Sequence, residues 1–93
     1  MRFDWDDKKN QLNFRKHGIS FDIAVSVFFD DNRIEYYDDA HSSLEEDRYI
    51  AIGTIYDRVT VISVVYTERG ASLRIISARK ATGVERKAYY EGI

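Results

Sequence analysis

The chain has 93 residues, 44% of them hydrophobic and 32% charged, with a formal net charge of −2, no cysteine and two histidines. These values predict a single globular domain over residues 1–93 and exclude disulfides, Fe–S clusters and cysteine-based zinc sites, and we expect no metal or other cofactor. No apolar run approaches the roughly 18 residues that span a bilayer, and the start lacks the apolar core of a secretory signal, so we expect a cytoplasmic protein with no membrane partner.

The first third of the chain predicts a short strand followed by two helices. A strand over Phe3–Trp5 precedes a helix that ends near Lys16, where Gly18 supplies the left-handed stop. Ser20 then caps a second helix. This helix carries an apolar stripe at helical spacing that must face a core, made of Phe21, Ala24, Val25 and Phe28.

From residue 33 the apolar pattern changes to a period of two, which is typical of strands. The strands are predicted at Arg33–Tyr37, Arg48–Ile55, Val59–Thr67 and Ser72–Arg79. Val59–Thr67 is apolar on both faces and should be central, and Asp38–Glu46 forms a polar loop. A capping box at Thr82 starts a last helix. Short connections leave no room for parallel crossovers, so we predict an α+β fold with two N-terminal helices, a four-stranded antiparallel sheet and a C-terminal helix.

The net charge conceals an asymmetry between the two halves of the chain. Residues 1–47 hold six Lys/Arg and twelve Asp/Glu, a net of −6, whereas residues 48–93 hold eight Lys/Arg and four Asp/Glu, a net of +4. Six of those eight basic residues are arginines, which bind phosphate through two parallel hydrogen bonds. A one-sided basic field is typical of a protein with a phosphate-bearing partner, although solvated strand and helix faces produce the same count.

Three arginines near the last two predicted strands are the strongest candidates for nucleic-acid chemistry. Arg69 lies at a hairpin tip, Arg74 lies mid-strand, and Arg79 lies at a strand end before a helix N-terminus that can hold a phosphate. Simple alternation places Arg74 on one face of its strand, with Ile76 and Ala78, and the residues Leu73, Ile75 and Ser77 on the other. An arginine among apolar residues needs a ligand or a carboxylate such as Glu35 or Glu68.

The chain also offers groups for RNA cleavage without a metal. A base takes the proton of the 2′-OH, cations stabilise the phosphorane, and an acid protonates the leaving 5′-oxygen. Arginine suits the charge-stabilising role. Candidates for proton transfer, among which the sequence does not choose, are His17, His41, Glu68, Lys8, Tyr66, Tyr89 and Tyr90.

Several of these residues have a simpler interpretation. His17 suits the C-terminal cap of a helix, and His41 in its polar loop is expected to be solvated and inert. Asp38, Asp39 and His41 resemble a loose metal cluster, but their spacing matches no known metal motif. Tyr89 can stack on a base, although such residues more often pack a terminal helix onto a sheet.

Ordered blocks of sequence cover essentially the whole chain. They are Phe3–Asp6, Arg15–Phe21, Asp47–Gly53, and Thr67–Gly70 with Arg74–Ala81 and Glu85–Tyr89. In this order and spacing the blocks resemble the BrnT family of bacterial toxins. The resemblance implies a RelE-like fold and a ribonuclease that arrests growth. It also implies neutralisation by a BrnA-like ribbon-helix-helix antitoxin, with operator DNA contacted only through that antitoxin.

We therefore expect a metal-independent endoribonuclease toxin of a type II toxin–antitoxin system. By similarity, the region of His17 and several arginines lies at or near the active site. The expected catalytic residues are Arg69, Arg74 and Arg79 for phosphate and transition-state charge, with His17 or Glu68 in proton transfer. The expected RNA contacts are Arg48, Lys80, Lys8 and Tyr89. The alternative is a non-catalytic module that holds a DNA-binding antitoxin and tunes operon repression.

Overall fold

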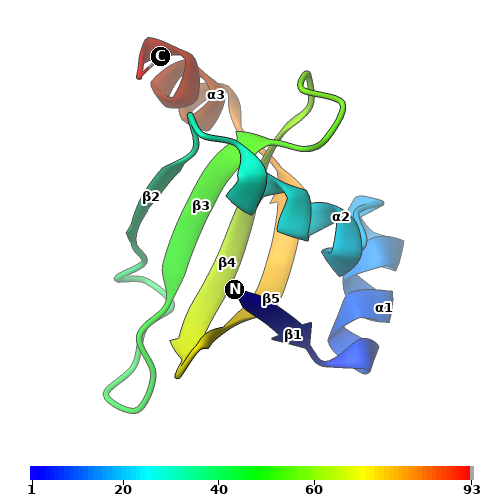
Figure 1. Ribbon diagram of the computed structural model, residues 1–93, viewed down its shortest axis with the longest axis vertical. Coiled ribbons are helices and arrows are strands. Elements are labelled where there is room, and N and C mark those ends of the chain that lie inside the picture. The colour runs from blue at the N-terminus through cyan, green and yellow to red at the C-terminus, as the bar shows by residue number, and fades with distance from the viewer. Residues whose placement is uncertain (93) are drawn as a thin grey trace.

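A computed structural model describes residues 1–92 and contains one five-stranded sheet with helices on both sides (Figure 1). Ile93, the final residue of the predicted domain, lies outside the described residues. The strand order is β1-β5-β4-β3-β2. The strands are β1 (Arg2–Trp5), β2 (Ile34–Tyr37), β3 (Tyr49–Thr54), β4 (Val61–Arg69) and β5 (Ser72–Lys80). The prediction that the most apolar strand is central is confirmed by β4.

The predicted α+β class is confirmed, but the predicted four-stranded antiparallel sheet is wrong. β1 joins the sheet as a fifth strand and runs parallel to β5, with Arg2 paired to Ser72 and Trp5 paired to Ile75. The other three pairings are antiparallel. The prediction considered only connections between consecutive strands. Two helices and three strands separate β1 from β5, which leaves ample chain for a parallel pairing.

The first helix is α1 (Asp7–His17), and the residues that flank it explain where it begins and where it ends. The Asp6 carboxylate accepts a 3.1 Å hydrogen bond from the Lys9 N–H at its start. Gly18 ends it with a φ of 72°, a left-handed conformation that glycine adopts without a steric penalty. The basic residues of its last turn lie at the negative end of the helix dipole.

The predicted second helix is shorter than its apolar stripe suggested. The α-helical part, α2 (Phe21–Val25), is followed by a turn of 3₁₀ helix, η1 (Ser26–Phe29). The Ser26 hydroxyl donates a 2.6 Å hydrogen bond to the Ile23 carbonyl oxygen, which competes with the regular helical ladder. Ser20 occupies the N-cap position without a side-chain cap bond. The Asn10 side chain instead accepts from the Phe21 N–H at 2.8 Å.

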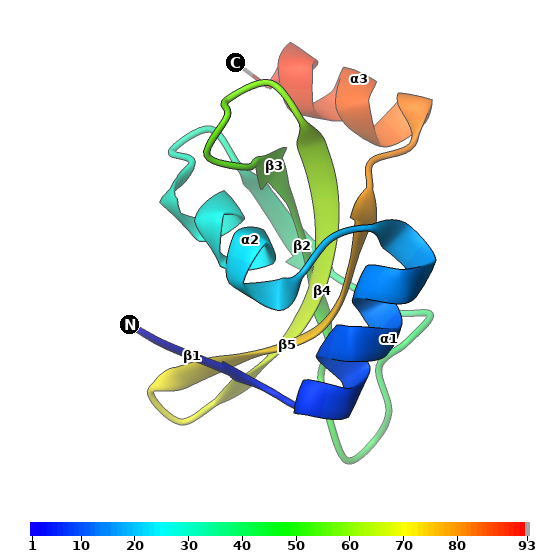
Figure 2. The same ribbon diagram turned by 90° about the vertical axis from the view of Figure 1, so that its right-hand side faces the viewer.

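The two faces of the sheet are covered differently. α2 and η1 cover one face, which we call the covered face, and the buried residues there include Phe21, Val27, Val64 and Ile75 (Figure 2). The last helix, α3 (Gly83–Glu91), lies across one end of the other side of the sheet. Its Tyr89 packs there in a small second cluster with Ile52 and Val61. The capping box predicted at Thr82 is confirmed.

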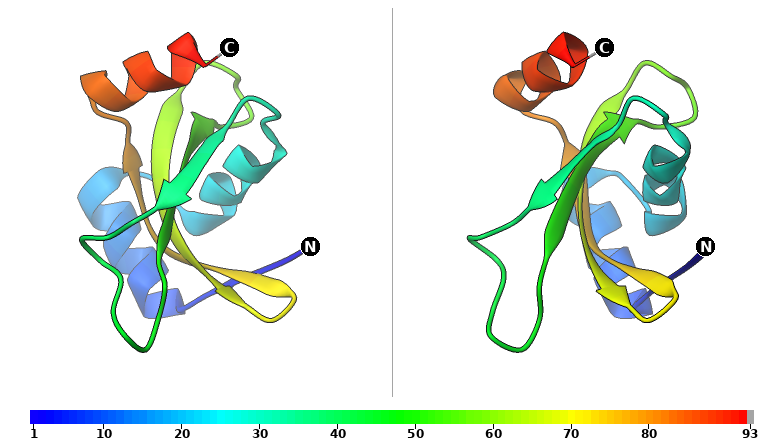
Figure 3. Two further views of the ribbon diagram at one scale, coloured as in Figure 1. Left: turned by 90° about the vertical axis from the view of Figure 1, so that its left-hand side faces the viewer. Right: turned by 60° about the vertical axis from the view of Figure 1, so that its left-hand side comes forward.

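The side of the sheet opposite α2 and η1, away from α3, is the open face. The loop between β2 and β3 and the β4–β5 hairpin both extend from the end of the sheet that lies away from α3 (Figure 3). On the open face Val65 and Ser77 are half-buried, whereas Ser63 and Thr67 are buried, as are Val64 and Ala78 on the covered face. Because α2 and η1 lie on the opposite side and α3 covers only one end, the rest of this side is the part of the sheet that is open to a ligand.

Asn13 of α1 closes the part of the β5 edge that β1 leaves unpaired. Its side-chain amide donates to the Ala78 carbonyl oxygen at 2.9 Å, and its oxygen accepts from the Ala78 N–H at 3.0 Å. The same amide nitrogen also donates to the Ile19 carbonyl oxygen at 2.8 Å. Asn13 thus takes the place of one residue of a neighbouring strand and pairs with the Ala78 N–H and C=O groups, which would otherwise lack partners at the edge.

Candidate active site

Strand register brings four arginines to the open face. Arg74 pairs with Thr67 and Arg79 pairs with Ser63, and residues paired across neighbouring strands point to the same face. Arg69 lies two residues beyond Thr67 in β4 and therefore shares its face. The Arg48 carbonyl oxygen accepts a hydrogen bond from the Asp38 N–H, and this bond extends the β2–β3 pairing by one residue pair. Arg48 lies two residues before Ile50, so its side chain points to the same face as that of Ile50.

A β-bulge is the reason that Arg74 and Arg79 share a face. An odd number of positions separates them, so a regular strand would point them in opposite directions. Val65 pairs with Ser77 and Tyr66 pairs with Ile75, which leaves Ile76 as the extra residue of the bulge. The predicted alternation of this strand is therefore wrong beyond Ile75. The residues Leu73, Ile75 and Ala78 face one side, and the residues Arg74, Ser77 and Arg79 face the other.

All four arginines are paired with carboxylates in the described part of the chain. Arg74 lies 2.8 Å from Asp4, and Arg79 makes two bonds of 2.7 and 3.0 Å to Glu85. The partner of Arg74 is thus neither Glu35 nor Glu68, because the parallel pairing of β1 brings Asp4 directly opposite it. These ion pairs are partly exposed, so they contribute little to stability and leave the guanidinium groups exchangeable.

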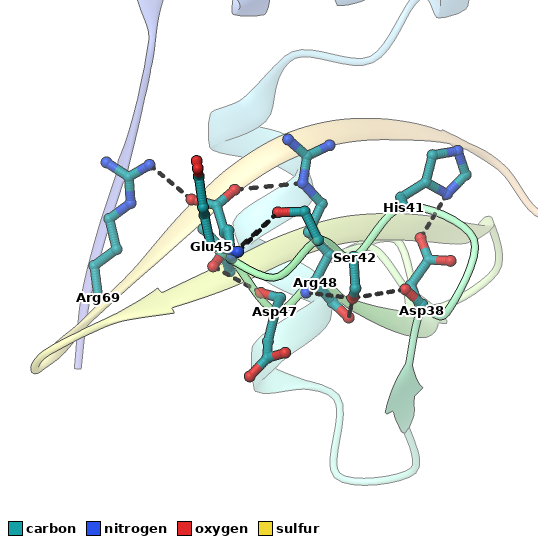
Figure 4. A network of polar contacts seen from close by, with 10 residues as sticks. Asp38, His41, Ser42, Glu45, Asp47, Arg48 and Arg69 are labelled. Carbon is teal, nitrogen blue, oxygen red and sulfur yellow. Dashed lines mark hydrogen bonds and ion pairs between the residues drawn. The ribbon is translucent and has the colours of Figure 1, made fainter.

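Glu46 connects the other two arginines. Its two oxygens lie 3.0 Å from Arg69 and 3.4 Å from Arg48, as Figure 4 shows by the dashed contacts of those arginines. The hydrogen bond from Arg69, followed by that from Arg48, holds the pKa of Glu46 below its ordinary value. One ionised carboxylate therefore neutralises one of two positive charges, and the trio keeps a net positive charge.

Glu85 is held in the same ionised state at the other end of the open face. Partial burial raises its pKa, but hydrogen bonds from Arg79 and Thr82 outweigh that effect and leave the pKa below its ordinary value. The pKa of Arg79 is raised in turn, chiefly because of its hydrogen bond to Glu85. Since Glu85 also belongs to the capping box, Arg79 is tied to the first turn of α3.

The loop between β2 and β3 carries His41, one of the predicted candidates for proton transfer, and pairs it with an aspartate that was not predicted as its partner. His41 Nδ1 lies 2.7 Å from Asp38 Oδ2, and the imidazole is exposed while the carboxylate is buried (Figure 4). The spacing of aspartate and histidine three positions apart was visible in the sequence, but it was considered only as a weak metal motif. His41 was expected to be solvated and inert, and its ring is indeed exposed, but it is held by a buried carboxylate.

Other predicted site residues lie away from the four arginines. Glu68 pairs with Leu73 and Lys80 pairs with Ile62, so both alternate onto the covered side, and they lie at opposite ends of the sheet. Lys8 and His17 lie in the first and the last turn of α1. Their roles in RNA binding and proton transfer stay predictions, without a common location on the open face.

Tyr89 is a core residue rather than a platform for a base. Its ring is only 3% exposed, and its hydroxyl donates a 2.6 Å hydrogen bond to Asp30. A ring buried to this extent has no face free for stacking, so the predicted RNA contact disagrees with its position. The alternative interpretation, in which Tyr89 packs the terminal helix onto the sheet, describes the structure.

Two hollows lie on the surface near the sheet. A hollow of about 470 Å³ adjoins Arg69 and is lined mostly by carboxylates, whereas a larger one of about 650 Å³ lies between η1, α3 and the β3–β4 turn. Among residues 1–92 no group of three or more His, Asp or Glu side chains is placed to hold a metal ion. No helix in that part of the chain is long and apolar enough to cross a membrane.

Comparison with known proteins identifies the family. No curated protein matches the chain. The sequence model of BrnT, described as the ribonuclease toxin of a type II toxin–antitoxin system, matches residues 5–85 of the 93-residue chain. This match spans every strand from β2 to β5 and the arginines of the open face. The chain therefore belongs to the BrnT family of ribonuclease toxins of type II toxin–antitoxin systems.

Proposed function

We propose that this chain is a metal-independent endoribonuclease toxin that binds RNA across the open face of its sheet. The observation that carries the proposal is the bulge in β5, which places Arg74 and Arg79 on the same open face as Arg48 and Arg69. Guanidinium groups bind phosphate oxygens in pairs and stabilise the charge of a pentacoordinate phosphorane. The membership of the family supplies the substrate class, RNA.

Cleavage proceeds by transfer of the phosphoryl group within the RNA strand. A base removes the proton of the 2′-OH, and the oxygen attacks the adjacent phosphorus. The bond from phosphorus to the 5′-oxygen breaks, and that oxygen takes a proton from an acid or from water. The products are a 2′,3′-cyclic phosphate and a 5′-hydroxyl. Arg74 and Arg79 neutralise the added negative charge during this step, so they lower the barrier and do not only tighten binding.

The carboxylates on the open face form ion pairs with the arginines until RNA is bound. Asp4 and Glu85 each hold one arginine, and a phosphodiester oxygen can take the place of either carboxylate oxygen. The exchange replaces one charge-assisted hydrogen bond with another, so its cost is small. The free protein thereby avoids an array of unpaired positive charges that would repel one another.

The partners follow from the type of system. We propose that the toxin acts in the cytoplasm, arrests growth, and is neutralised by a BrnA-like antitoxin with a ribbon-helix-helix domain. The acidic first half of the chain and the basic second half provide complementary surfaces for such a partner. Contact with operator DNA is then made by the antitoxin, and the toxin itself has no membrane partner in this proposal.

The test is cleavage of total RNA by the purified protein in the presence of EDTA. We expect degradation to persist in EDTA, to yield 2′,3′-cyclic phosphate ends, and to spare DNA. Arg74→Ala should lower the cleavage rate by about 10²-fold or more, while the fold is retained because the Asp4 pair is partly exposed. Arg58→Ala is the matched control, because Arg58 lies in the β3–β4 turn at the opposite end of the sheet.

The second candidate is a non-catalytic module that holds a DNA-binding antitoxin and tunes operon repression. The pairing of all four open-face arginines with carboxylates favours it, since paired arginines are also found at structural surfaces. Absence of RNA degradation, together with nanomolar binding to the product of the neighbouring gene, would support this candidate and overturn the ribonuclease proposal.

A further inference from the structure

Asp38 and His41 form an oriented pair at the end of β2. His41 Nδ1 lies 2.7 Å from Asp38 Oδ2. The Asp38 side chain is 6% exposed and that of His41 is 63% exposed. Because a carboxylate accepts hydrogen bonds, it selects the imidazole form with a proton on Nδ1 and leaves the Nε2 lone pair free. The ring thus presents a basic nitrogen to solvent in a defined orientation.

The register of β2 places this pair on the open face. Tyr36 pairs with Ile50, and Asp38, two residues further along, donates its N–H to the Arg48 carbonyl oxygen at 2.8 Å. By alternation, the side chains of Tyr36 and Asp38 therefore point to the same face as Arg48. Figure 4 shows the imidazole of His41 and the guanidinium of Arg48 extending to the same side of the loop.

Ser42 holds the loop in this conformation. Its hydroxyl donates to the Asp38 carbonyl oxygen at 2.7 Å and accepts from the Arg48 N–H at 2.8 Å. Its own N–H donates to the Asp38 carbonyl oxygen at 3.0 Å. These bonds close the base of the loop, so His41 projects from an anchored turn and not from a free segment. A preorganised base loses little entropy when the substrate binds.

We infer that His41 is the general base of the ribonuclease and that Asp38 is its positioning residue. The inference rests on the proposed function. His41 Nε2 takes the proton of the 2′-OH, the 2′-oxygen forms a bond to phosphorus, and the bond to the 5′-oxygen breaks. Water supplies a proton to that leaving oxygen, and the imidazolium returns its proton to solvent. Asp38 stabilises the imidazolium formed during the step.

Charged and titratable side chains near His41 come from its own loop and from the two strands that the loop joins. Asp38 and Asp39 lie in the loop, Arg48 with its partner Glu46 lies across the ladder, and the Tyr36 hydroxyl lies next along β2. A bound phosphodiester adds negative charge close to Arg48. An acid limb in the pH–rate profile is the signature of a histidine that acts as a general base.

The test compares four variants on a fluorescently labelled RNA transcript over a range of pH. His41→Gln should lower kcat by about 10²-fold and abolish the acid limb of the pH–rate profile, with KM within about twofold of the wild type. Asp38→Asn should lower kcat by about tenfold, since the amide no longer stabilises the imidazolium. Asp39→Asn removes the same charge from the same loop and should leave both parameters unchanged. Added imidazole should restore part of the activity to His41→Ala.

The outcomes separate the two proposals. If the wild type cleaves RNA, and His41→Gln cleaves at the wild-type rate with an unchanged pH profile, the inference about His41 is overturned while the proposed function stands. If the wild type cleaves no RNA, the proposed function fails and this inference fails with it. His41 is the decisive position, because its exposed ring can be replaced without disturbing the fold, which circular dichroism checks.

Discussion

The covered and open faces are two sides of the same strands and have opposite chemistry. The covered face packs Phe21, Val27 and Val64 with no exposed surface, whereas the open face presents Arg74 and Arg79 in partly exposed ion pairs. Strand alternation separates the two sets residue by residue, and the bulge in β5 corrects the alternation where it would send Arg79 to the wrong side. Stability and ligand binding can therefore change independently in this sheet.

The carboxylate of Asp30, at the end of the sheet, also differs from the carboxylates of the open face. Asp30 accepts three hydrogen bonds at one oxygen, from the Thr54 N–H at 2.8 Å, the Thr54 hydroxyl at 2.9 Å and the Tyr89 hydroxyl at 2.6 Å. A Cβ at Gly53 would lie 3.1 Å from that oxygen, so glycine leaves room for it. Asp30 joins η1, β3 and α3 through neutral donors, whereas the open-face carboxylates Asp4, Glu46 and Glu85 bind positively charged arginines.

The largest expected effect on stability comes from the covered face. Phe21→Ala should lower the free energy of unfolding by about 3–5 kcal/mol, because a fully buried aromatic ring is removed and a cavity remains. Urea denaturation measures the change. Phe29→Ala, which alters a ring that is 75% exposed, should cost less than about 1 kcal/mol. Equal losses at the two positions would contradict the assignment of the core to one face.

A smaller effect is expected at Asp30 and should depend on pH. Partial burial raises the pKa of Asp30, but hydrogen bonds from Tyr89 and Thr54 outweigh it, so the pKa lies below its ordinary value. The stabilisation is therefore complete above the pKa of the unfolded chain, near about 4, and is lost as the pH falls through the folded pKa. Asp30→Asn should lower the free energy of unfolding by about 1–3 kcal/mol at pH 7.

Urea denaturation of Asp30→Asn at pH 7 and at pH 3 checks this sign. The difference from the wild type should narrow in acid, since the wild-type carboxylate then becomes protonated as well. Asp31→Asn provides a control for the loss of charge in the same turn. A difference that stays constant, or widens, as the pH falls would show that the carboxylate of Asp30 does not carry the stabilisation.

The smallest effect is expected at Glu46 and concerns binding alone. Glu46→Gln releases Arg48 and Arg69, so affinity for an RNA that carries a blocking 2′-deoxy substitution should increase by about threefold and its salt dependence should steepen. Fluorescence anisotropy over a salt series measures both. Glu45→Gln removes one negative charge from the neighbouring residue and serves as the control. Equal gains in the two variants would indicate a general charge effect and not the release of arginines.

Much of the fold was predictable because its signals are local. The helix stop at Gly18, the capping box at Thr82 and the central position of β4 were each predicted from a few neighbouring residues. The parallel pairing of β1 was not, because it depends on a contact between segments about 70 positions apart. The 3₁₀ helix that begins at Ser26 was not predicted either, since an apolar stripe does not distinguish a 3₁₀ helix from an α-helix.

The candidate site was predictable only as a set of residue types. The concentration of arginine in the second half of the chain pointed to Arg74 and Arg79. Their common face, however, results from the bulge in β5, and a bulge has no reliable sequence signal. The contact between Asp38 and His41 was not predicted, for a related reason. A loop of mixed polar residues gives no indication of which side chains bond to one another until the strands on either side are placed in register.

The parallel pairing of β1 with β5 also has a consequence for synthesis on the ribosome. Asp4 emerges among the first residues, yet its partner Arg74 is made about 70 residues later, so the nascent chain holds β1 without its neighbour for most of translation. The edge of the basic surface is thus assembled at the last stage of elongation.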